Sequence, residues 1–287
     1  MVVDYAALKS GGFMRQKQKN HFSMRLKVVG GELEASQLKA IAGAAEKYGR
    51  GRVHLTSRQG VEIPFIKLAD VENVKAELLS AGVFTGVCGP RVRTVTACQG
   101  SAVCPSGCID TYALARDISE RYFGRELPHK FKFGVTGCRN NCLKAEENDL
   151  GVKGVYSVSW SRESCSLCGV CAKVCREGAI SVNDETLVVD EKLCSLCGRC
   201  AKACPSDAWR GEPAYLLSFG GMFGNRIAAG RQILPPLTDT AALFRAADAA
   251  LNFFDAHGKP GERFLVAVER AGWDTFEKTV RAEALYA

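Results

Sequence analysis

The sequence predicts an α+β protein into which a small cysteine-rich domain is inserted. Two observations support this fold class. Residues 13–82 alternate between the period of a strand and the period of a helix. Residues 161–207 are short, cysteine-dense and internally repeated, whereas the sequence from residue 214 to the end returns to ordinary globular composition. The chain has 287 residues, which is enough to bury a sizeable core around such an insert.

The N-terminal region is predicted to be a small α/β unit. Its periodicity indicates, in order, a strand, a helix, two strands and a second helix, over residues 22–29, 36–48, 52–56, 61–66 and 70–82. Ser36 and Asp70 are of the residue types that cap helix N-termini. The order β-α-β-β-α is that of a ferredoxin-like half.

The remainder of the chain supplies further elements on both sides of the insert. Strands are expected over 91–97 and 130–135, with a helix over 110–122 between them. In the tail, Thr238 is the expected N-cap of a helix that runs to residue 256, and two more helical stretches flank Gly272.

The inserted segment contains two cysteine runs with the same spacing, C-x2-C-x2-C-x3-C. This is the pattern of bacterial two-cluster ferredoxins, in which three cysteines hold one 4Fe–4S cluster and the fourth ligates the other. It predicts two ligand sets, which are Cys165, Cys168, Cys171 and Cys204 for one cluster and Cys194, Cys197, Cys200 and Cys175 for the other. The alternative is a pair of zinc knuckles, but a zinc site uses two CxxC pairs and leaves the other cysteines without a role.

Composition narrows the classes of partner. The chain has 14 cysteines, which in a reducing compartment favour metal binding over disulfides. Residues 1–12 lack the pattern of a signal peptide, and the apolar runs are shorter than the roughly 18 residues of a membrane span, so we expect a cytoplasmic protein without membrane contact. The net charge of +7 suits either a solvated basic face or an acidic ligand. The sequence lacks a dense basic run interleaved with aromatic residues, so we do not expect nucleic acid as a partner.

Four segments carry a resemblance to a known family. They are HLTSRQGVEI (54–63), RVRTVTACQGSAVC (91–104), PHKFKFGVTGCRNNCLKAEENDLG (128–151) and SFGGMFGNRIAAG (218–230). Together they resemble the sulfite and nitrite reductases that couple sirohaem to a 4Fe–4S cluster. The run from 137 to 151 is especially similar to the catalytic subunits of anaerobic sulfite reductases and to small relatives that also carry a ferredoxin insert.

The resemblance implies a sulfite reductase half of the sirohaem fold, containing the inserted ferredoxin domain. It implies four regions: a ferredoxin-like half (1–85), a sirohaem and 4Fe–4S domain (86–160), the two-cluster ferredoxin insert (161–207) and a continuation of the sirohaem domain (208–287). The third cluster would be held by two separated cysteine pairs, namely Cys98, Cys104, Cys138 and Cys142. Cys142 would bridge that cluster and the sirohaem iron. Three clusters leave Cys88 and Cys108 without an assigned role.

Positively charged residues in the same segments match an anion site. Reduction of sulfite needs positive charge and proton donors, and the matching positions are Arg58, Arg93, Lys130 and Lys132. Lys130 and Lys132 are two apart on an expected strand, so they project from one face. Arg91 is likewise two residues from Arg93 on an expected strand, so it could replace Arg93 in the anion site. Sirohaem bears several carboxylates, for which the candidates are Arg15, Lys17, Lys19 and Arg25, although a solvated basic segment explains these four equally well.

The leading hypothesis is six-electron reduction of sulfite to sulfide, with sirohaem and three 4Fe–4S clusters as cofactors. One alternative is reduction of nitrite to ammonia on the same scaffold; in that branch of the family the second lysine is typically neutral, so Lys132 favours sulfite. Another is an electron-transfer subunit without catalysis, which would leave the four cations without a role. No flavin or nicotinamide motif is present, so an external donor is expected, either a flavin-containing partner subunit or a ferredoxin. A two-fold homodimer is a further expectation, because the chain has one half where longer relatives have two.

Overall fold

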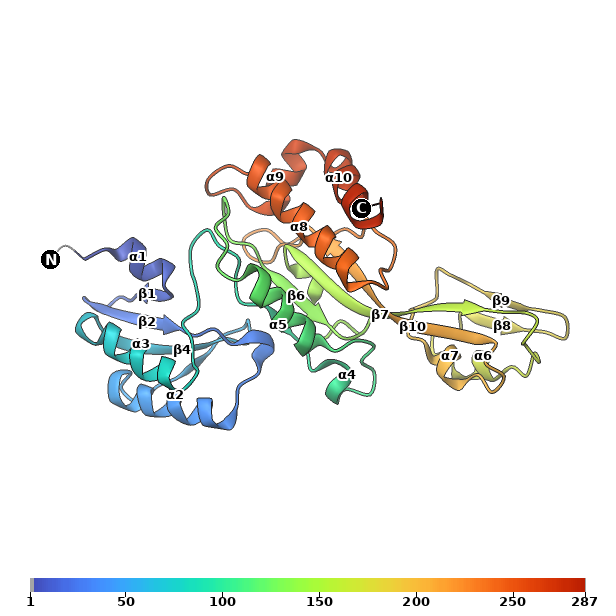
Figure 1. The fold of residues 1–287 in the computed structure, drawn as a ribbon, viewed down its shortest axis with the longest axis horizontal. Helices are drawn as coiled ribbons and strands as arrows, with labels where there is room; N and C mark the ends of the chain where they lie inside the picture. Colours follow the sequence, from blue (N-terminus) through green and yellow to red (C-terminus); the bar gives the residue numbers. More distant parts are fainter. Residues whose placement is uncertain (1–2, 287) are drawn as a thin grey trace.

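The computed structural model describes residues 3–286. Residues 1, 2 and 287, which the first and last predicted regions include, lie outside the described residues. Within that range the strands form two four-stranded sheets and one two-stranded sheet. Figure 1 shows these sheets side by side along the long axis of the molecule, with the N-terminal sheet at one end and the smallest sheet at the other.

The N-terminal sheet has the strand order β1-β2-β4-β3 and carries helices α2 and α3. Its elements are α1 (Tyr5–Ser10), β1 (Phe13–Arg15), β2 (His21–Arg25), α2 (Ala35–Tyr48), β3 (His54–Leu55), β4 (Val61–Lys67) and α3 (Val71–Ser80), with short 3-10 turns at Val29–Gly31 and Leu68–Asp70. Alternation along β2 buries Phe22 and Met24, which pack with Ile63 of β4 and Ile41 of α2. The predicted order of elements is therefore present.

This region differs from the prediction in several details. Helix α1 and strand β1 were not predicted, and the strand expected over 52–56 is limited to His54–Leu55. The strand expected over 22–29 ends at Arg25, because the chain turns back through the 3-10 turn, where Gly30 has a φ of 64°. Helix α2 begins one residue before the expected cap, Ser36. Glu34 occupies the N-cap position, and its backbone N–H donates to the Gln37 side chain at 3.0 Å. The Glu34 side chain in turn accepts from the backbone N–H of Gln37. Ser36 is of a suitable residue type, but this reciprocal pair of contacts fixes the start of the helix.

The central sheet has the order β10-β7-β6-β5 and holds most of the core. Its elements are β5 (Thr96–Ala97), α4 (Gly100–Val103), α5 (Thr111–Tyr122), β6 (Phe133–Thr136), a 3-10 turn at Ala145–Glu147, β7 (Leu150–Trp160) and β10 (Trp209–Phe219). Strands β5, β6 and β7 are parallel, and β10 is antiparallel to β7. Helix α5 matches the range predicted for it, 110–122, and it begins after Asp110, whose side chain accepts from two backbone N–H groups.

The two strands expected over 91–97 and 130–135 are shorter than predicted. Only their C-terminal parts pair continuously, as β5 and β6, while Val92 and Phe131 form an isolated bridge. Lys130 and Lys132 therefore precede strand β6. The segment stays extended, because Phe131 lies between backbone hydrogen bonds to Arg91 and Arg93.

The C-terminal helices are α8 (Thr240–His257), α9 (Phe264–Ala271) and α10 (Trp273–Tyr286). They pack against the central sheet through aromatic contacts: Phe131 lies 5.0 Å from Phe264 and 6.2 Å from Phe254, ring centre to ring centre. The helix expected to start at Thr238 is capped instead by Asp239, whose carboxylate accepts from the N–H groups of Ala241 and Ala242. Among residues 3–286, no helix combines the length and apolarity needed to cross a membrane.

The cysteine-rich segment lies at the far end of the β7–β10 hairpin. Trp160 and Trp209 are register partners where the two long strands end, and the chain between them forms α6 (Val170–Val174), β8 (Ile180–Val182), β9 (Leu187–Val189) and α7 (Arg199–Ala203). Strands β8 and β9 pair only with each other. In Figure 1 this small unit extends away from the central sheet, with β7 and β10 as its connection.

Candidate active site

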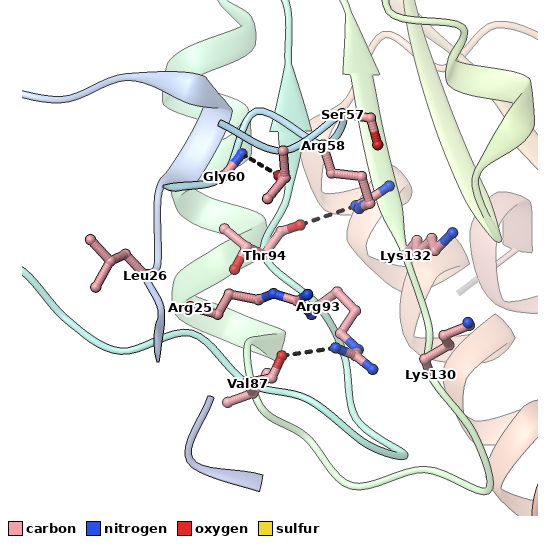
Figure 2. A pocket seen from close by; sticks show the side chains of 11 residues that line it. Arg25, Leu26, Ser57, Arg58, Gly60, Val87, Arg93, Thr94, Lys130 and Lys132 are labelled. Carbon is pink, nitrogen blue, oxygen red and sulfur yellow. Dashed lines mark hydrogen bonds between the residues drawn. The ribbon is translucent and has the colours of Figure 1, made fainter. Parts of the chain in front are cut away.

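A positively charged cavity lies between the N-terminal half and the central sheet. Its volume is about 280 Å³, and its charged lining is Arg25, Arg58, Arg93, Lys130 and Lys132. The remaining lining residues are small, apolar or uncharged: Leu26, Thr56, Ser57, Gly60, Val87 and Thr94. Figure 2 shows the two lysines on one side of the cavity and the three arginines facing them. The structure therefore brings the four predicted anion-binding residues together.

The two arginines of the anion site are fixed by backbone and side-chain acceptors. Arg58 lies in a tight turn in which the Thr56 hydroxyl accepts from the Gly60 N–H at 3.0 Å. Its guanidinium donates to Asn148 Oδ1 at 2.7 Å and to the Thr94 carbonyl at 3.2 Å. Arg93 donates to two backbone carbonyls, each at 2.9 Å. Neither guanidinium is neutralised by a carboxylate in these contacts, so positive charge remains available to a ligand.

The two lysines face the cavity because their neighbours face the core. Phe131 and Phe133 are fully buried, and side chains alternate along an extended chain. Lys130 and Lys132 must then lie on the opposite face, as Figure 2 shows. The predicted projection of both lysines from one face is observed, although they lie just before strand β6 and not within it.

Burial and like charge weaken proton binding by these cations. Burial lowers the pKa of Lys132 to about 8, and the neighbouring Arg58 and Arg263 contribute to the decrease. Burial likewise lowers the pKa of Lys130, and it lowers that of Arg58 to about 10. Such a group of partly buried cations is unfavourable unless an anion compensates it. The cavity is therefore suited to a small oxyanion or a carboxylate.

The other predicted basic residues divide into two groups. Arg25 lines the cavity, where it donates to Glu62 at 2.6 and 2.8 Å and to Cys88 Sγ at 3.1 Å. Arg91 pairs with Glu126 and lies outside the cavity lining. Arg15, Lys17 and Lys19 also lie outside that lining. The Arg15 guanidinium lies over the Tyr5 ring.

Three residues of the site were not predicted from the sequence: Asn148, Asp149 and Arg263. Asn148 and Asp149 follow the Ala145–Glu147 turn, which lies directly on the sheet because Gly134 and Gly151 leave room for it. A Cβ on Gly134 would stand 2.3 Å from Asn148 Nδ2, and one on Gly151 would stand 2.3 Å from a backbone oxygen of the turn. Asn148 holds Arg58, while Asp149 accepts the Lys132 N–H at 2.9 Å and pairs with Arg263 at 3.0 Å. Asn148 and Asp149 lie within the 128–151 segment, but the arginines that they bind are 90 and 114 residues away in the sequence, so no local pattern assigned these contacts.

The four cysteines of the predicted third cluster gather where strands β5 and β6 end. Cys98 directly follows β5, and Cys138 lies two residues beyond β6. Burial raises the pKa of the Cys138 thiol, and the nearby thiols of Cys104, Cys142 and Cys98 add to the rise. Because β5 and β6 are parallel, Arg93 and Lys132 lie before the strands and the cysteines lie after them. The cationic cavity and the cysteine group thus share the same pair of strands.

The insert places its eight cysteines around two separate cavities. One is lined by Cys165, Cys168, Cys171 and Cys204, and the other by Cys175, Cys194, Cys197 and Cys200. This is the partition that the repeated spacing predicts. Apolar side chains complete both linings; Leu187 and Trp209 contribute to the first and Val158 and Ile180 to the second.

The donor set of the insert is eight thiols in two groups of four. A 4Fe–4S cluster binds each of four thiolates at a separate iron, so each group matches the ligand count of one cluster. Within residues 3–286, no group of three or more His, Cys, Asp or Glu side chains is arranged to hold a single metal ion.

The charge of the cationic cavity suits the acidic periphery of the sirohaem that the resemblance implies. The ligand has an acidic periphery, and the cavity presents uncompensated cations whose pKa values are lowered by burial. Arg93 Nε is buried without a hydrogen-bond partner among the described residues. Unpaired buried donors next to an open cavity indicate that a ligand completes the site. The residues present therefore fit an anionic cofactor or substrate.

Two family models match the chain. "Nitrite and sulphite reductase 4Fe-4S domain" matches residues 88–286, and "Nitrite/Sulfite reductase ferredoxin-like half domain" matches residues 14–81. The fold is similar to the crystal structure of dissimilatory sulfite reductase I, with a TM-score of 0.73 over 91% of this chain and 69% of that chain. The sequence identity to that structure is 19%, so this similarity shows the fold alone.

Curated relatives extend the comparison to sequence. The coenzyme F420-dependent sulfite reductase of Methanocaldococcus jannaschii is 33% identical over 94% of this chain, which spans 44% of that protein's length. An anaerobic sulfite reductase subunit of Salmonella typhimurium is 32% identical over 75% of this chain and 69% of that protein. These matches confirm the resemblance seen in the four sequence segments. With an α+β fold that contains the ferredoxin-like half domain, and with the two models together covering most of its length, this chain belongs to the nitrite and sulphite reductase family.

Proposed function

We propose that this protein reduces sulfite to sulfide at the cationic cavity, using sirohaem and three 4Fe–4S clusters. The observation that carries the proposal is the convergence of Arg25, Arg58, Arg93, Lys130 and Lys132 on one cavity, beside strands that end in four gathered cysteines. Two sulfite reductases, those of Methanocaldococcus jannaschii and Salmonella typhimurium described above, share about a third of their aligned residues with this chain.

The side chains of the cavity supply binding and protons. Reduction of hydrogensulfite to hydrosulfide takes up six electrons and six protons and releases three waters. Sirohaem, when bound, supplies an iron with an open coordination position and a route for electrons. Arg58 and Arg93 are held by neutral acceptors, so their charge can orient the sulfite oxygens. Lys130 and Lys132 donate protons to those oxygens, and a lysine whose pKa lies near neutrality donates more readily than an ordinary one.

Nitrite reduction is the second candidate. The nitrite reductase of Emericella nidulans is 33% identical over 142 residues, so both activities occur among the relatives. The cavity favours sulfite because it presents two lysines, where the resemblance implies one in the nitrite branch. Sulfite has three oxygens that must be bound and protonated, whereas nitrite has two. The five cations that line this cavity therefore suit the larger oxyanion.

We propose an order for the two insert clusters from their positions. Leu196, in the loop of Cys194 and Cys197, packs on Val155 of β7, and its carbonyl accepts the Tyr156 N–H at 2.7 Å. Cys108 lies near both Cys138 and Cys197: burial raises its pKa to about 11, and those two thiols contribute to the rise. The Cys194 cluster would therefore be proximal to the catalytic cluster. The Cys165 cluster would be distal and would receive electrons from an external donor.

A visible spectrum tests this proposal against a purely electron-transferring subunit. Protein purified without oxygen should show haem bands in addition to cluster absorption, and it should contain about 13 iron atoms per chain, four in each of three clusters and one in sirohaem. Sulfite should shift the haem bands. Cluster absorption without any haem band in fully loaded protein would favour the electron-transfer role.

A further inference from the structure

A buried ion pair lies directly beneath Lys132. Asp149 is fully buried, and its two carboxylate oxygens accept from Arg263 Nη2 at 3.0 and 3.2 Å. The same carboxylate accepts the backbone N–H of Lys132 at 2.9 Å. One carboxylate thus joins the extended segment that bears the lysine to a distant arginine.

Arg263 comes from the C-terminal helices and lies outside the four short segments quoted in the sequence analysis. It is the N-cap residue of helix α9, at the end of the loop that follows α8. The same loop is tied to the lysine segment by a hydrogen bond from the Gly261 N–H to the Pro128 carbonyl at 3.0 Å. The C-terminal helices therefore hold the lysine segment at two points, one before Lys130 and one at Lys132.

Stability alone gives a weak reason for such a pair. Burying two charges costs about as much solvation as their attraction returns, and apolar side chains of similar volume often serve the fold better. Arg263 Nε also lacks a hydrogen-bond partner among the described residues, although it is buried. A charged pair in this position acts on its surroundings, and the nearest part of the cavity is Lys132.

We propose that Asp149 and Arg263 are positioning residues for Lys132: the carboxylate fixes the backbone of the lysine, and the opposite charges of the pair balance the field at its ammonium group. This inference rests on the proposed function, because it assigns the pair to proton donation at that site. It assigns a role to two residues that lie behind the cavity lining, because neither lines the cavity itself and Asp149 contacts the backbone of Lys132.

The charges around Lys132 define how the pair acts. Arg58 faces it from the turn after β3, and Lys130 precedes it on the same segment. Arg93, from the segment before β5, and Arg25, from β2, line the same cavity. Among its neighbours, Arg263 lowers the pKa of Lys132, while Asp149 raises it. Removal of the carboxylate alone should then lower the pKa of Lys132, whereas removal of the whole pair should also take away the lowering effect of Arg263.

The test compares Asp149→Asn with the double variant Asp149→Asn/Arg263→Gln in the complete, cofactor-loaded protein. Two readouts are used: the pH profile of sulfite turnover, and the pH dependence of Lys132 acetylation by acetic anhydride, followed by mass spectrometry. In the parent, the lysine should lose its proton near pH 8, so turnover falls and acetylation rises through that value. Asp149→Asn should move both midpoints to lower pH by about one unit, and the double variant should move them back upward.

Controls separate this effect from a general change in charge or folding. Glu269→Gln removes a carboxylate that pairs with Arg226 on the exposed side of α9, and it should leave both midpoints in place. The double variant leaves no unpaired buried charge, so it keeps the test informative if Asp149→Asn alone folds poorly.

Two results would overturn the inference. Midpoints that stay at the parent value in both variants would reduce the pair to a structural contact. An acetylation midpoint that moves while the turnover midpoint does not would exclude a role in catalysis. Absence of sulfite turnover in the parent would refute the proposed function instead, and the acetylation profile would still report on the ion pair.

Discussion

Lys132→Met should lose about 10²-fold or more in sulfite turnover while it retains sirohaem and all three clusters. The lysine faces the cavity with four other cations, and its pKa of about 8 allows proton donation near neutral pH. Methionine keeps most of the side-chain volume and removes both the charge and the proton. The measurement is steady-state sulfite reduction, with iron and haem content determined on the same sample.

Folding should not suffer from this substitution. Because the pKa of Lys132 is lower in the folded chain than its ordinary value of 10.5, the folded state binds fewer protons and its stability rises with pH between about 8 and 10.5. Below pH 8 the buried charge opposes folding in full. In buffer without sulfate or phosphate at pH 7, Lys132→Met should be more stable than the parent by about 1 kcal/mol, after allowance for solvent screening.

Substrate preference gives a second readout at the same position. Lys132→Asn, which copies the nitrite-type pattern that the resemblance implies, should lose sulfite turnover more than nitrite turnover. Equal losses with both substrates would show that the lysine does not distinguish them. A Lys132→Met protein that keeps its cofactors and reduces sulfite like the parent would remove the anion-site assignment.

Cys165→Ser should remove one cluster and leave the others. It takes one of four cysteines from the distal cavity, so the variant should lose about four iron atoms per chain and the matching inorganic sulfide. Turnover driven by a protein donor should fall steeply, because that cluster is the proposed point of electron entry. Turnover driven by a strong small reductant should persist, since the catalytic site is intact.

The matched control is Cys108→Ser. Cys108 is buried near Cys138 and Cys197, which belong to two different proposed clusters, but it is not itself a proposed ligand of any cluster. This variant should therefore keep all its iron. Cys98→Ser, in contrast, should lose activity with every reductant, because Cys98 belongs to the proposed ligand set of the cluster that would pass electrons to sirohaem. Full iron and sulfide content in Cys165→Ser would show that the two-cluster assignment is wrong.

The parts of the structure that sequence predicted best are those set by local chemistry. The repeated cysteine spacing predicted two groups of four, and the structure places those groups around two cavities. The order of strands and helices in the N-terminal region followed from periodicity. Helix starts were less accurate: Ser36 and Thr238 are good capping types, but Gln37 and Asp239 make the contacts that fix α2 and α8.

The site was predicted in part, for a physical reason. Arg58, Arg93, Lys130 and Lys132 lie within the short segments that carry the resemblance, and the resemblance identified them as candidates for the anion site. Arg263 lies 114 residues from Asp149 and meets it only because α9 packs on the central sheet. Long-range partners of this kind depend on tertiary packing, which neither charge pattern nor periodicity records.

Sulfite-dependent oxidation of a low-potential dye by protein purified without oxygen is the decisive assay for the proposed reaction. The assay follows dye oxidation and sulfide release together, with nitrite as the competing substrate. We predict that about six electrons are consumed for each sulfide formed, and that kcat/KM is higher for sulfite than for nitrite. Dye oxidation that requires nitrite, or no oxidation with either anion in fully loaded protein, would contradict sulfite reduction at this site.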